Sequence, residues 1–285
     1  MCREPRFILL RKANDGVVNH PVLVFGAGLL AGAMNAAAGG GSFVTLPALI
    51  FAGLSPVIAN TSSTVALLPG ALTSSWIYRG EVKNFKGPPV QVLLAMSLLG
   101  GLIGALLLLF TPSQTFDRLL PWLLLIGTVV FAFGKQAGAM LRKVIAIGPA
   151  TLVVAQLLLA VYGGYFGGAV GLMMMAVWQL LGIVNLKALN AVKTQMVAAA
   201  NAIAVICFIV AGKVAWPETL LMLVAGVMGG YLGARIAQRL SERWLRAGII
   251  TISAAMTLAF FLARSKPARP TGQFQAPGTW LRADR

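Results

Sequence analysis

Hydrophobic residues run through this chain in long tracts that short polar or basic segments separate. No charged side chain occurs from Pro21 to Tyr78 or from Val144 to Leu186. One helix that crosses the bilayer core needs roughly 20 apolar residues, so each of these tracts has to fold back on itself inside the membrane. The pattern predicts an all-α, polytopic membrane protein with about 8 to 10 hydrophobic segments.

Glycines and polar residues interrupt both uncharged tracts. The expected apolar segments are 21–38, 43–53, 57–78, 89–110, 119–134, the interrupted tract 144–186, and then 188–211, 215–234 and 246–263. Pro56 is the expected opening residue of the third segment, because proline favours the first helical turn. The pattern leaves open whether each short piece crosses the membrane, pairs with its neighbour into one broken helix, or re-enters.

Basic residues gather between the apolar segments, in the predicted loops 79–87 and 135–143 and in the region 235–246. The predicted loop Thr111–Arg118 is nearly neutral. The positive-inside rule places the basic loops on the cytoplasmic side. Keeping the third basic region there as well requires a different number of crossings for the interrupted tract in the second half than in the first.

The composition supports an integral membrane protein and argues against a nucleic-acid partner. Apolar residues make up 58% of the chain and charged residues 11%, with a mean hydropathy of +0.85; soluble domains are about 25% charged. The net charge of +16 is divided among loops and tails, whereas nucleic-acid-binding domains gather basic residues on one face. The basic start, the apolar stretch and Ala36–Ala38 could also form a cleaved signal peptide, but we expect a retained helix, because the stretch has a later counterpart.

The two halves of the chain carry matching residues in the same order. Gly41 matches Gly171, Asn60 matches Asn190, and Trp122 matches Trp244. This order predicts an internal duplication in one membrane domain, with a basic tail at 1–20, a first repeat at 21–143, a second repeat at 144–263 and a basic tail at 264–285. Glycines four residues apart predict close helix packing at Gly28/Gly32, Gly100/Gly104, Gly163/Gly167 and Gly229/Gly233.

Polar side chains and glycines in the interrupted tracts form the candidate substrate site. Such groups are costly at membrane depth unless they are buried in protein or line a cavity, and broken helices expose N–H groups that bind anions. Duplicated, glycine-interrupted segments are also typical of a transporter site near the membrane midplane. The candidate substrate-binding residues are Asn35, Gly39, Gly40, Gly41, Ser42, Asn60, Thr61, Ser62, Gly167, Gly171, Asn190, Lys193, Thr194 and Asn201, with Gln195 beside them.

Lys193 is the most informative of these residues. It lies several residues inside an apolar segment, at the position that Ser63 occupies in the first half. We interpret it as a cation that faces an anionic substrate; the alternative is a lysine whose ammonium group reaches the membrane interface. The two halves of the site should therefore differ in charge.

The carboxylates exclude several functions by their positions. Of the seven Asp and Glu residues, all but Glu218 lie in predicted loops or tails, whereas proton relays and cation sites in membranes use buried carboxylates. His20, at the edge of the first segment, is expected to be interfacial. The sequence contains no Ser/His/Asp set, metal-ligand cluster or nucleotide-binding loop, so we expect no enzyme activity, no cofactor and no metal site.

Several motifs resemble the TauE/SafE sulfite exporter family over roughly residues 21 to 262. In the first half they are Asn35-Ala36, Ala38-Gly39-Gly40-Gly41-Ser42, Gly53-Leu54-Ser55-Pro56 and Ala59-Asn60-Thr61-Ser62. In the second half they are Tyr162-Gly163-Gly164-Tyr165-Phe166-Gly167-Gly168, Asn190-Ala191-Val192-Lys193 and Gly212-Lys213-Val214. At Ala169 this chain departs from the glycine that the family pattern would have.

The resemblance implies a multi-pass permease of the inner cell membrane that moves sulfite, organosulfonates or related small anions. We expect export of sulfite or a similar sulfur oxyanion, with a small anion and the lipid bilayer as partners. Two alternatives remain open, an uptake permease for sulfonates or organic acids and a membrane scaffold without transport activity. A homodimer is compatible with the sequence, which does not fix the oligomeric state.

Overall fold

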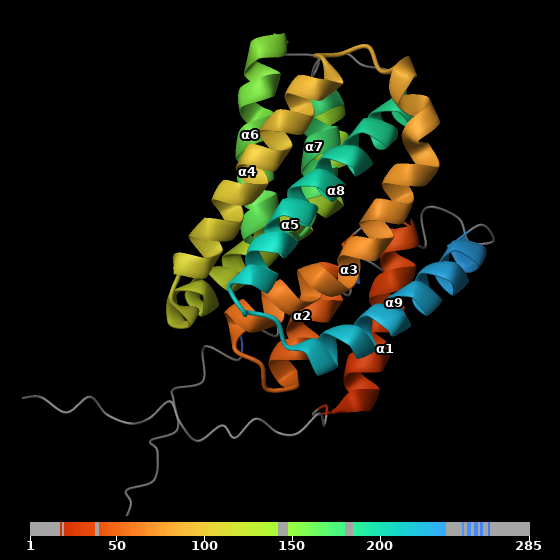
Figure 1. Ribbon diagram of the computed structural model, residues 1–285. Helices are drawn as coiled ribbons and strands as arrows, with labels where there is room; N and C mark the ends of the chain where they lie inside the picture. The colour runs from red at the N-terminus through yellow and green to blue at the C-terminus, as the bar shows by residue number, and fades with distance from the viewer. Residues whose placement is uncertain are drawn as a thin grey trace, which may run out of the picture.

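The computed structural model describes residues 18, 20–37, 40–141, 148–179 and 185–237, together with isolated positions between 247 and 262. The described regions are mainly helical (Figure 1). The helices are α1 (Pro21–Ala37), α2 (Ser42–Phe51), α3 (Pro56–Tyr78), the 3-10 helix η1 (Arg79–Asn84), α4 (Val90–Phe110), α5 (Ser113–Leu141), α6 (Pro149–Tyr165), α7 (Val170–Gln179), α8 (Leu186–Val210) and α9 (Trp216–Ala237).

Most helix boundaries agree with the hydrophobic pattern. Pro56 is the first residue of α3, as expected, and α4 and α8 begin and end within two residues of the predicted segments. The loop expected at Thr111–Arg118 is wrong, because α5 already begins at Ser113; the same helix continues to Leu141 through most of the basic loop expected at 135–143. Hydropathy marks the apolar middle of a helix, and polar residues extend α5 beyond it at both ends. Most of the predicted segment 246–263 lies outside the described residues.

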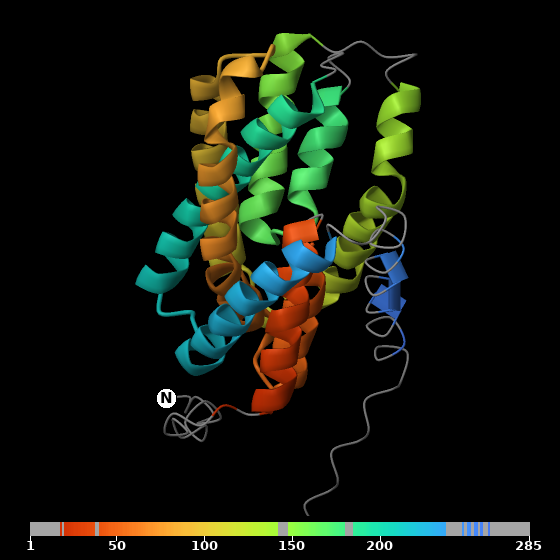
Figure 2. The same cartoon turned by 90° about the vertical axis from the view of Figure 1, so that its right-hand side faces the viewer.

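Four short helices form two hairpins. α1 contacts α2, and α6 contacts α7, with breaks after Ala37 and after Tyr165. The 10 residues of α2 and of α7 extend only about 15 Å at 1.5 Å per residue, half the thickness of a bilayer core. Figure 2 shows α1 beginning at the lower end of the bundle and α6 at the upper end. The two hairpins therefore enter the bundle from opposite ends.

Longer helices pack against the first arm of each hairpin. α1 packs along α9, and α4 packs along α6 and α8, while α3 contacts both α8 and α9 (Figure 1). The predicted small-residue contacts make these approaches possible. A Cβ added at Gly28 would lie 2.7 Å from the carbonyl oxygen of Met222, and one at Gly100 would lie 2.7 Å from that of Leu157. Glycine at these positions lets the helix backbones touch.

Gly163 and Gly167 differ from the other predicted pairs. A Cβ at Gly163 would meet the Val170 side chain at 3.2 Å, so this glycine packs against α7. Gly167 has a φ of +80° and no close neighbour at its Cβ position except the carbonyl oxygen of Gly163 at 3.5 Å. Its role is to adopt the left-handed backbone between α6 and α7, which glycine does without steric cost.

The outer surface of the helices is apolar, as expected for lipid contact. Large hydrophobic side chains such as Phe110, Leu158, Val210 and Tyr231 are exposed, and large exposed apolar surfaces mark contact with a membrane or another protein. Within the part of the chain that the structure describes, two helices, Val90–Phe110 and Lys187–Val210, are long and apolar enough to cross a membrane. The interior is filled by two buried apolar clusters, one centred on α2 and α5 and one between α4, α6, α7 and α8.

Candidate functional site

Asn60 and Ser63 of α3 bind other helices. Asn60 is buried and donates a hydrogen bond from Nδ2 to the carbonyl oxygen of Tyr165, the last residue of α6, at 3.0 Å. Ser63 is also buried, with its Oγ 2.5 Å from Oγ1 of Thr45 in α2. These contacts attach the first half of α3 to the end of α6 and to the middle of α2.

Thr61 and Ser62 point toward a third neighbour, the connection between α8 and α9. The Thr61 hydroxyl donates to the carbonyl oxygen of Lys213, and the Ser62 Oγ accepts from the N–H of Ala215 at 2.9 Å. Successive helical residues are about 100° apart around the axis. The polar run from Asn60 to Ser63 therefore surrounds α3, and its four side chains join α3 to three other elements: α6, α2 and the connection between α8 and α9.

The first glycine break is closed by Asn35. Its Oδ1 accepts a hydrogen bond of 2.8 Å from the N–H of Gly41, which precedes α2. The N–H groups of Phe43 and Val44, in the first turn of α2, donate to the carbonyl oxygens of Gly40 and Gly41. Gly40 has a left-handed φ of +90°. Ser42 is the first residue of α2, and Gly39 lies outside the described residues.

Lys193 lies against the second glycine break. The position that a Cβ on Gly171 would occupy is 3.2 Å from Cδ and 3.6 Å from Cε of Lys193. Gly171 is in the first turn of α7, so the aliphatic part of the lysine passes over the start of that short helix. Among the described residues Lys193 forms no salt bridge. Its charge is therefore available to an anion that enters this region.

Four of the second-half candidates share one face of α8. At 3.6 residues per turn, Asn190, Lys193, Thr194 and Asn201 fall within about 100° of one another around the helix axis. Thr194 donates to the carbonyl oxygen of Asn190 within the helix. Asn201 has a buried Oδ1 with no hydrogen-bond partner among the described residues. This arrangement differs from the first half, where the polar residues point in several directions.

Lys193 lies far from the backbone groups that bind Thr61 and Ser62. Thr61 and Ser62 contact the chain beyond the end of α8, at Lys213 and Ala215. Lys193 lies 17 residues before Val210, the last residue of α8, which is roughly 25 Å of helix. Thr61 and Ser62 are therefore on the far side of the bundle from the backbone of Lys193, and the structure does not place them around one ligand with it.

Gln156 is a second polar residue that contacts α7, and the sequence pattern gives no signal for it. Gln156 of α6 is fully buried and donates from Nε2 to Oγ of Ser97 in α4 at 2.9 Å and to Sδ of Met174 in α7 at 3.7 Å. Its Oε1 is buried and has no partner among the described residues. Gln156 is one polar side chain in an apolar tract, and its partners are far away in sequence, so neither spacing nor composition identifies it.

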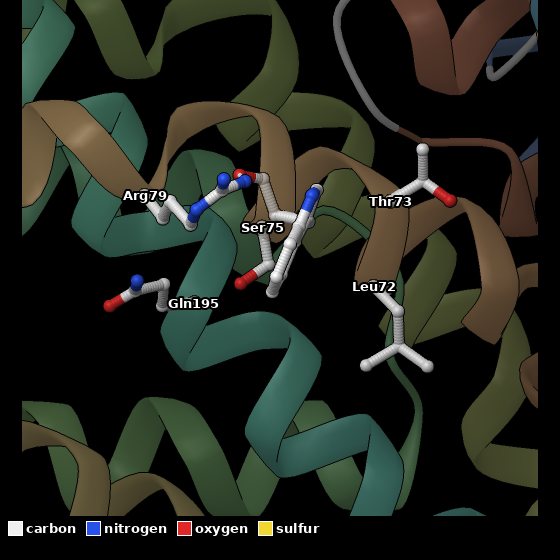
Figure 3. A pocket seen from close by; sticks show the side chains of 6 residues that line it. Leu72, Thr73, Ser75, Arg79 and Gln195 are labelled. Atoms are coloured by element: carbon white, nitrogen blue, oxygen red, sulfur yellow. Dashed lines mark hydrogen bonds between the residues drawn. The ribbon is translucent and has the colours of Figure 1, made fainter.

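Gln195 lies apart from this region. It lines an open groove of about 660 Å³ with Leu72, Thr73, Ser75, Trp76 and Arg79 of α3 and η1 (Figure 3). Gln195 is two residues after Lys193, so it projects from the opposite side of α8. The Arg79 guanidinium lies 3.8 Å from the centre of the Trp76 ring. The groove is a surface feature at the end of α3, and it is separate from the contact between Lys193 and Gly171.

The remaining ionisable groups form no catalytic set in the described part of the chain. No group of three or more His, Cys, Asp or Glu side chains could hold a metal ion there. Glu218, buried in the first turn of α9, is placed where a negative charge stabilises a helix N-terminus. His20 precedes α1 and is exposed, at the position where an interfacial residue was expected.

Comparison with known proteins identifies relatives over most of the chain. The family described as "Sulfite exporter TauE/SafE" matches residues 24–260. The chain is 27% identical to the "Probable membrane transporter protein YfcA" of Escherichia coli (strain K12), over 82% of this chain and 87% of the relative. It is also 27% identical to a "Probable membrane transporter protein" of Haemophilus influenzae, over 82% and 92% of the two chains. No solved structure matches.

Proposed function

Since this chain belongs to the sulfite exporter TauE/SafE family, we propose that it exports sulfite or a related small sulfur oxyanion across the inner cell membrane. The family establishes a membrane transporter and not an enzyme; the substrate, the direction and the membrane are our proposal. The candidate site residues of the second half, Gly171, Asn190, Lys193, Thr194 and Asn201, would contact the anion.

The contact between Lys193 and Gly171 carries this proposal. A cation that is half-buried in a membrane helix without a carboxylate partner is costly, and a bound anion would offset that cost. The absence of a side chain on Gly171 brings Lys193 close to the start of α7. The N-terminus of a helix carries a partial positive charge. The lysine and the helix end would therefore attract the same negatively charged ligand.

We also propose that the two halves are duplicated and inverted relative to each other. The pairing of α1 with α9 has its counterpart in the pairing of α6 with α4, and α3 contacts α8 at the centre. The α1–α2 and α6–α7 hairpins begin at opposite ends of the bundle (Figure 2). Inverted repeats with broken helices bind substrates near the membrane midplane, which supports a site at the tips of the hairpins.

The membrane potential could drive export without a proton relay. Moving one negative charge out of a cell with an inside-negative potential is favourable by about 2.3 kcal/mol per 100 mV. This mechanism requires no buried carboxylate at the site, and among the described Asp and Glu residues only Glu218, in the first turn of α9, is buried. Bisulfite, a substrate that carries its own proton, would also cross with one negative charge.

The proposal is tested by sulfite flux from proteoliposomes with a potential set by potassium and valinomycin. Efflux should require the protein and should accelerate when the side that holds the substrate is negative. Protein-dependent sulfite efflux that ignores the potential would exclude the electrical mechanism. Proteoliposomes that retain sulfite and release an organic acid instead would exclude sulfite as the substrate.

A further inference from the structure

We infer that Gln156 is a further substrate-contacting residue, and that with Lys193 it selects a monoanionic oxyanion that still carries one proton. This inference rests on the proposed function, because it concerns the anion that occupies the same site. It narrows the substrate class to an ion that offers both hydrogen-bond acceptors and one O–H donor, as the O-protonated form of bisulfite does.

The first observation is that Gln156 and Lys193 contact the same side of α7. Lys193 lies over Gly171, and the NH₂ group of Gln156 donates to the sulfur of Met174 at 3.7 Å. Gly171 and Met174 are three residues apart and therefore neighbours on one helix face, about 4.5 Å apart along the axis. The two polar side chains approach adjacent turns of one short helix from α8 and α6.

The second observation fixes the orientation of the Gln156 amide. The Ser97 hydroxyl has one hydrogen, which it donates to the carbonyl oxygen of Leu93 at 2.7 Å. Its Oγ can then only accept, so the group that faces it at 2.9 Å is the NH₂ of Gln156. The Oε1 of Gln156 is directed away from Ser97. It is a fully buried acceptor without a partner, which is rare in folded proteins.

The chemistry of these two groups is complementary to a protonated oxyanion. The Lys193 ammonium donates hydrogen bonds and balances one negative charge, whereas the Gln156 carbonyl can only accept. If the anion carried no proton, one of its oxygens and the Gln156 carbonyl oxygen would face each other with no hydrogen between them. Bisulfite in its O-protonated form supplies the missing hydrogen. Methanesulfonate has the same charge and a similar size but no O–H group, and so it would leave Oε1 unpaired.

A third buried polar atom lies on the same face. Trp178 is one turn beyond Met174 on α7, is fully buried, and has an Nε1 without a partner among the described residues. Val170, Gly171, Met174 and Trp178 all fall within about 100° around the α7 axis. This side of the short helix thus lies beside a cation, the Gln156 amide and an unpaired donor within two turns.

The inference is tested by competition in proteoliposomes that transport radiolabelled sulfite. Unlabelled sulfite or methanesulfonate is added to the wild-type protein and to Gln156→Met, which keeps the volume and removes the acceptor. Because loss of a required hydrogen-bond partner rejects a ligand strongly, the wild type should prefer bisulfite by at least about 10-fold. In Gln156→Met that preference should disappear, through weaker binding of bisulfite and unchanged binding of methanesulfonate. Sulfite uptake by the wild type should also fall at alkaline pH, as bisulfite loses its proton.

Ser97→Ala and Gln91→Met complete the test. Ser97→Ala frees the Gln156 amide to turn its NH₂ toward the ligand, so methanesulfonate should bind more tightly. Gln91 is exposed near the start of α4, and Gln91→Met makes the same chemical change away from α7 without altering the preference. Equal weakening of both anions in Gln156→Met, or no change in either, would overturn the inference while leaving sulfite export intact. A wild type that transports neither anion would overturn the proposed function itself.

Discussion

Lys193 of α8 and Gly171 of α7 are in direct contact, with the lysine Cδ 3.2 Å from the position that a Cβ on residue 171 would occupy. The two residues are 22 positions apart, and a connection separates their helices. The contact places the one lysine within the apolar part of α8 at the start of a helix that is too short to cross the membrane. The proposed anion site depends on this geometry.

Gly171→Ala should separate protein stability from anion affinity. The new methyl group would push the Lys193 side chain aside by a few tenths of an ångström, and alanine is a better helix former than glycine by up to about 1 kcal/mol. We expect an unchanged or higher melting temperature and a several-fold weaker affinity for sulfite. A variant with wild-type affinity would show that the position of Lys193 does not matter.

Gly32→Ala should destabilise the pairing of α1 with α9. Its Cβ would collide with the backbone of α9, at the carbonyl oxygen of Gly226 and, 2.7 Å away, at the nitrogen of Gly230. Overpacking costs about 1–3 kcal/mol, and a backbone cannot move aside as a side chain does. Gly26→Ala is the matched control in the same helix, because nothing lies within 4 Å of its Cβ position. Thermal unfolding in detergent should distinguish the two variants; equal melting temperatures would contradict the close packing.

Ala169→Gly should stabilise the protein. Ala169 has a left-handed φ of +57° at the start of α7, a conformation that costs a residue with a side chain about 1–2 kcal/mol. Glycine removes that strain, and the greater freedom of the unfolded chain offsets part of the gain, about 0.4–1 kcal/mol. A net increase of about 0.5–1 kcal/mol in the unfolding free energy is expected from these two terms. A loss of stability would mean that the buried methyl group contributes more packing than strain.

Asn60→Ala should weaken the attachment of α3 to the α6–α7 hairpin. The change leaves the carbonyl oxygen of Tyr165 without the amide that binds it at 3.0 Å, and an unpaired buried group costs about 1–3 kcal/mol. Thr73→Ala, which removes an exposed hydroxyl bonded within its own helix, should change stability by less than about 0.5 kcal/mol. Chemical denaturation of the two variants gives the comparison. Similar unfolding midpoints would argue that this hydrogen bond does not join the two elements.

The helices of this protein could be predicted from its sequence because each apolar run is long and sharply bounded. Pro56 and the glycine breaks mark their helix ends by local backbone chemistry, independent of tertiary contacts. The start of α5 at Ser113 could not be predicted in the same way, since polar residues such as Asp117 occur equally well in the first turns of a helix and in a loop. The arrangement of α2 and α7 as short returning helices depends on packing between distant segments.

The candidate site was less predictable than the fold. Lys193 is identifiable because a charge in an apolar helix is unusual, whereas its contact with Gly171 is a tertiary feature. Asn60, Thr61 and Ser62 were all predicted to bind the substrate, but neighbouring residues of a helix point about 100° apart, and here they contact different elements. Gln156 carries no charge and belongs to no motif, so only the folded arrangement of α4, α6 and α7 shows its unpaired oxygen.

The central claim, that Lys193 binds the transported anion, is tested most directly by sulfite flux through Lys193→Met. The control is Lys187→Met, because Lys187 is exposed at the start of the same helix. Losing a hydrogen bond from a charged donor costs about 1.5–3 kcal/mol, so the half-saturating sulfite concentration should rise about 10- to 100-fold in Lys193→Met and stay unchanged in Lys187→Met. A correctly folded Lys193→Met protein that transports sulfite with wild-type affinity would contradict the claim.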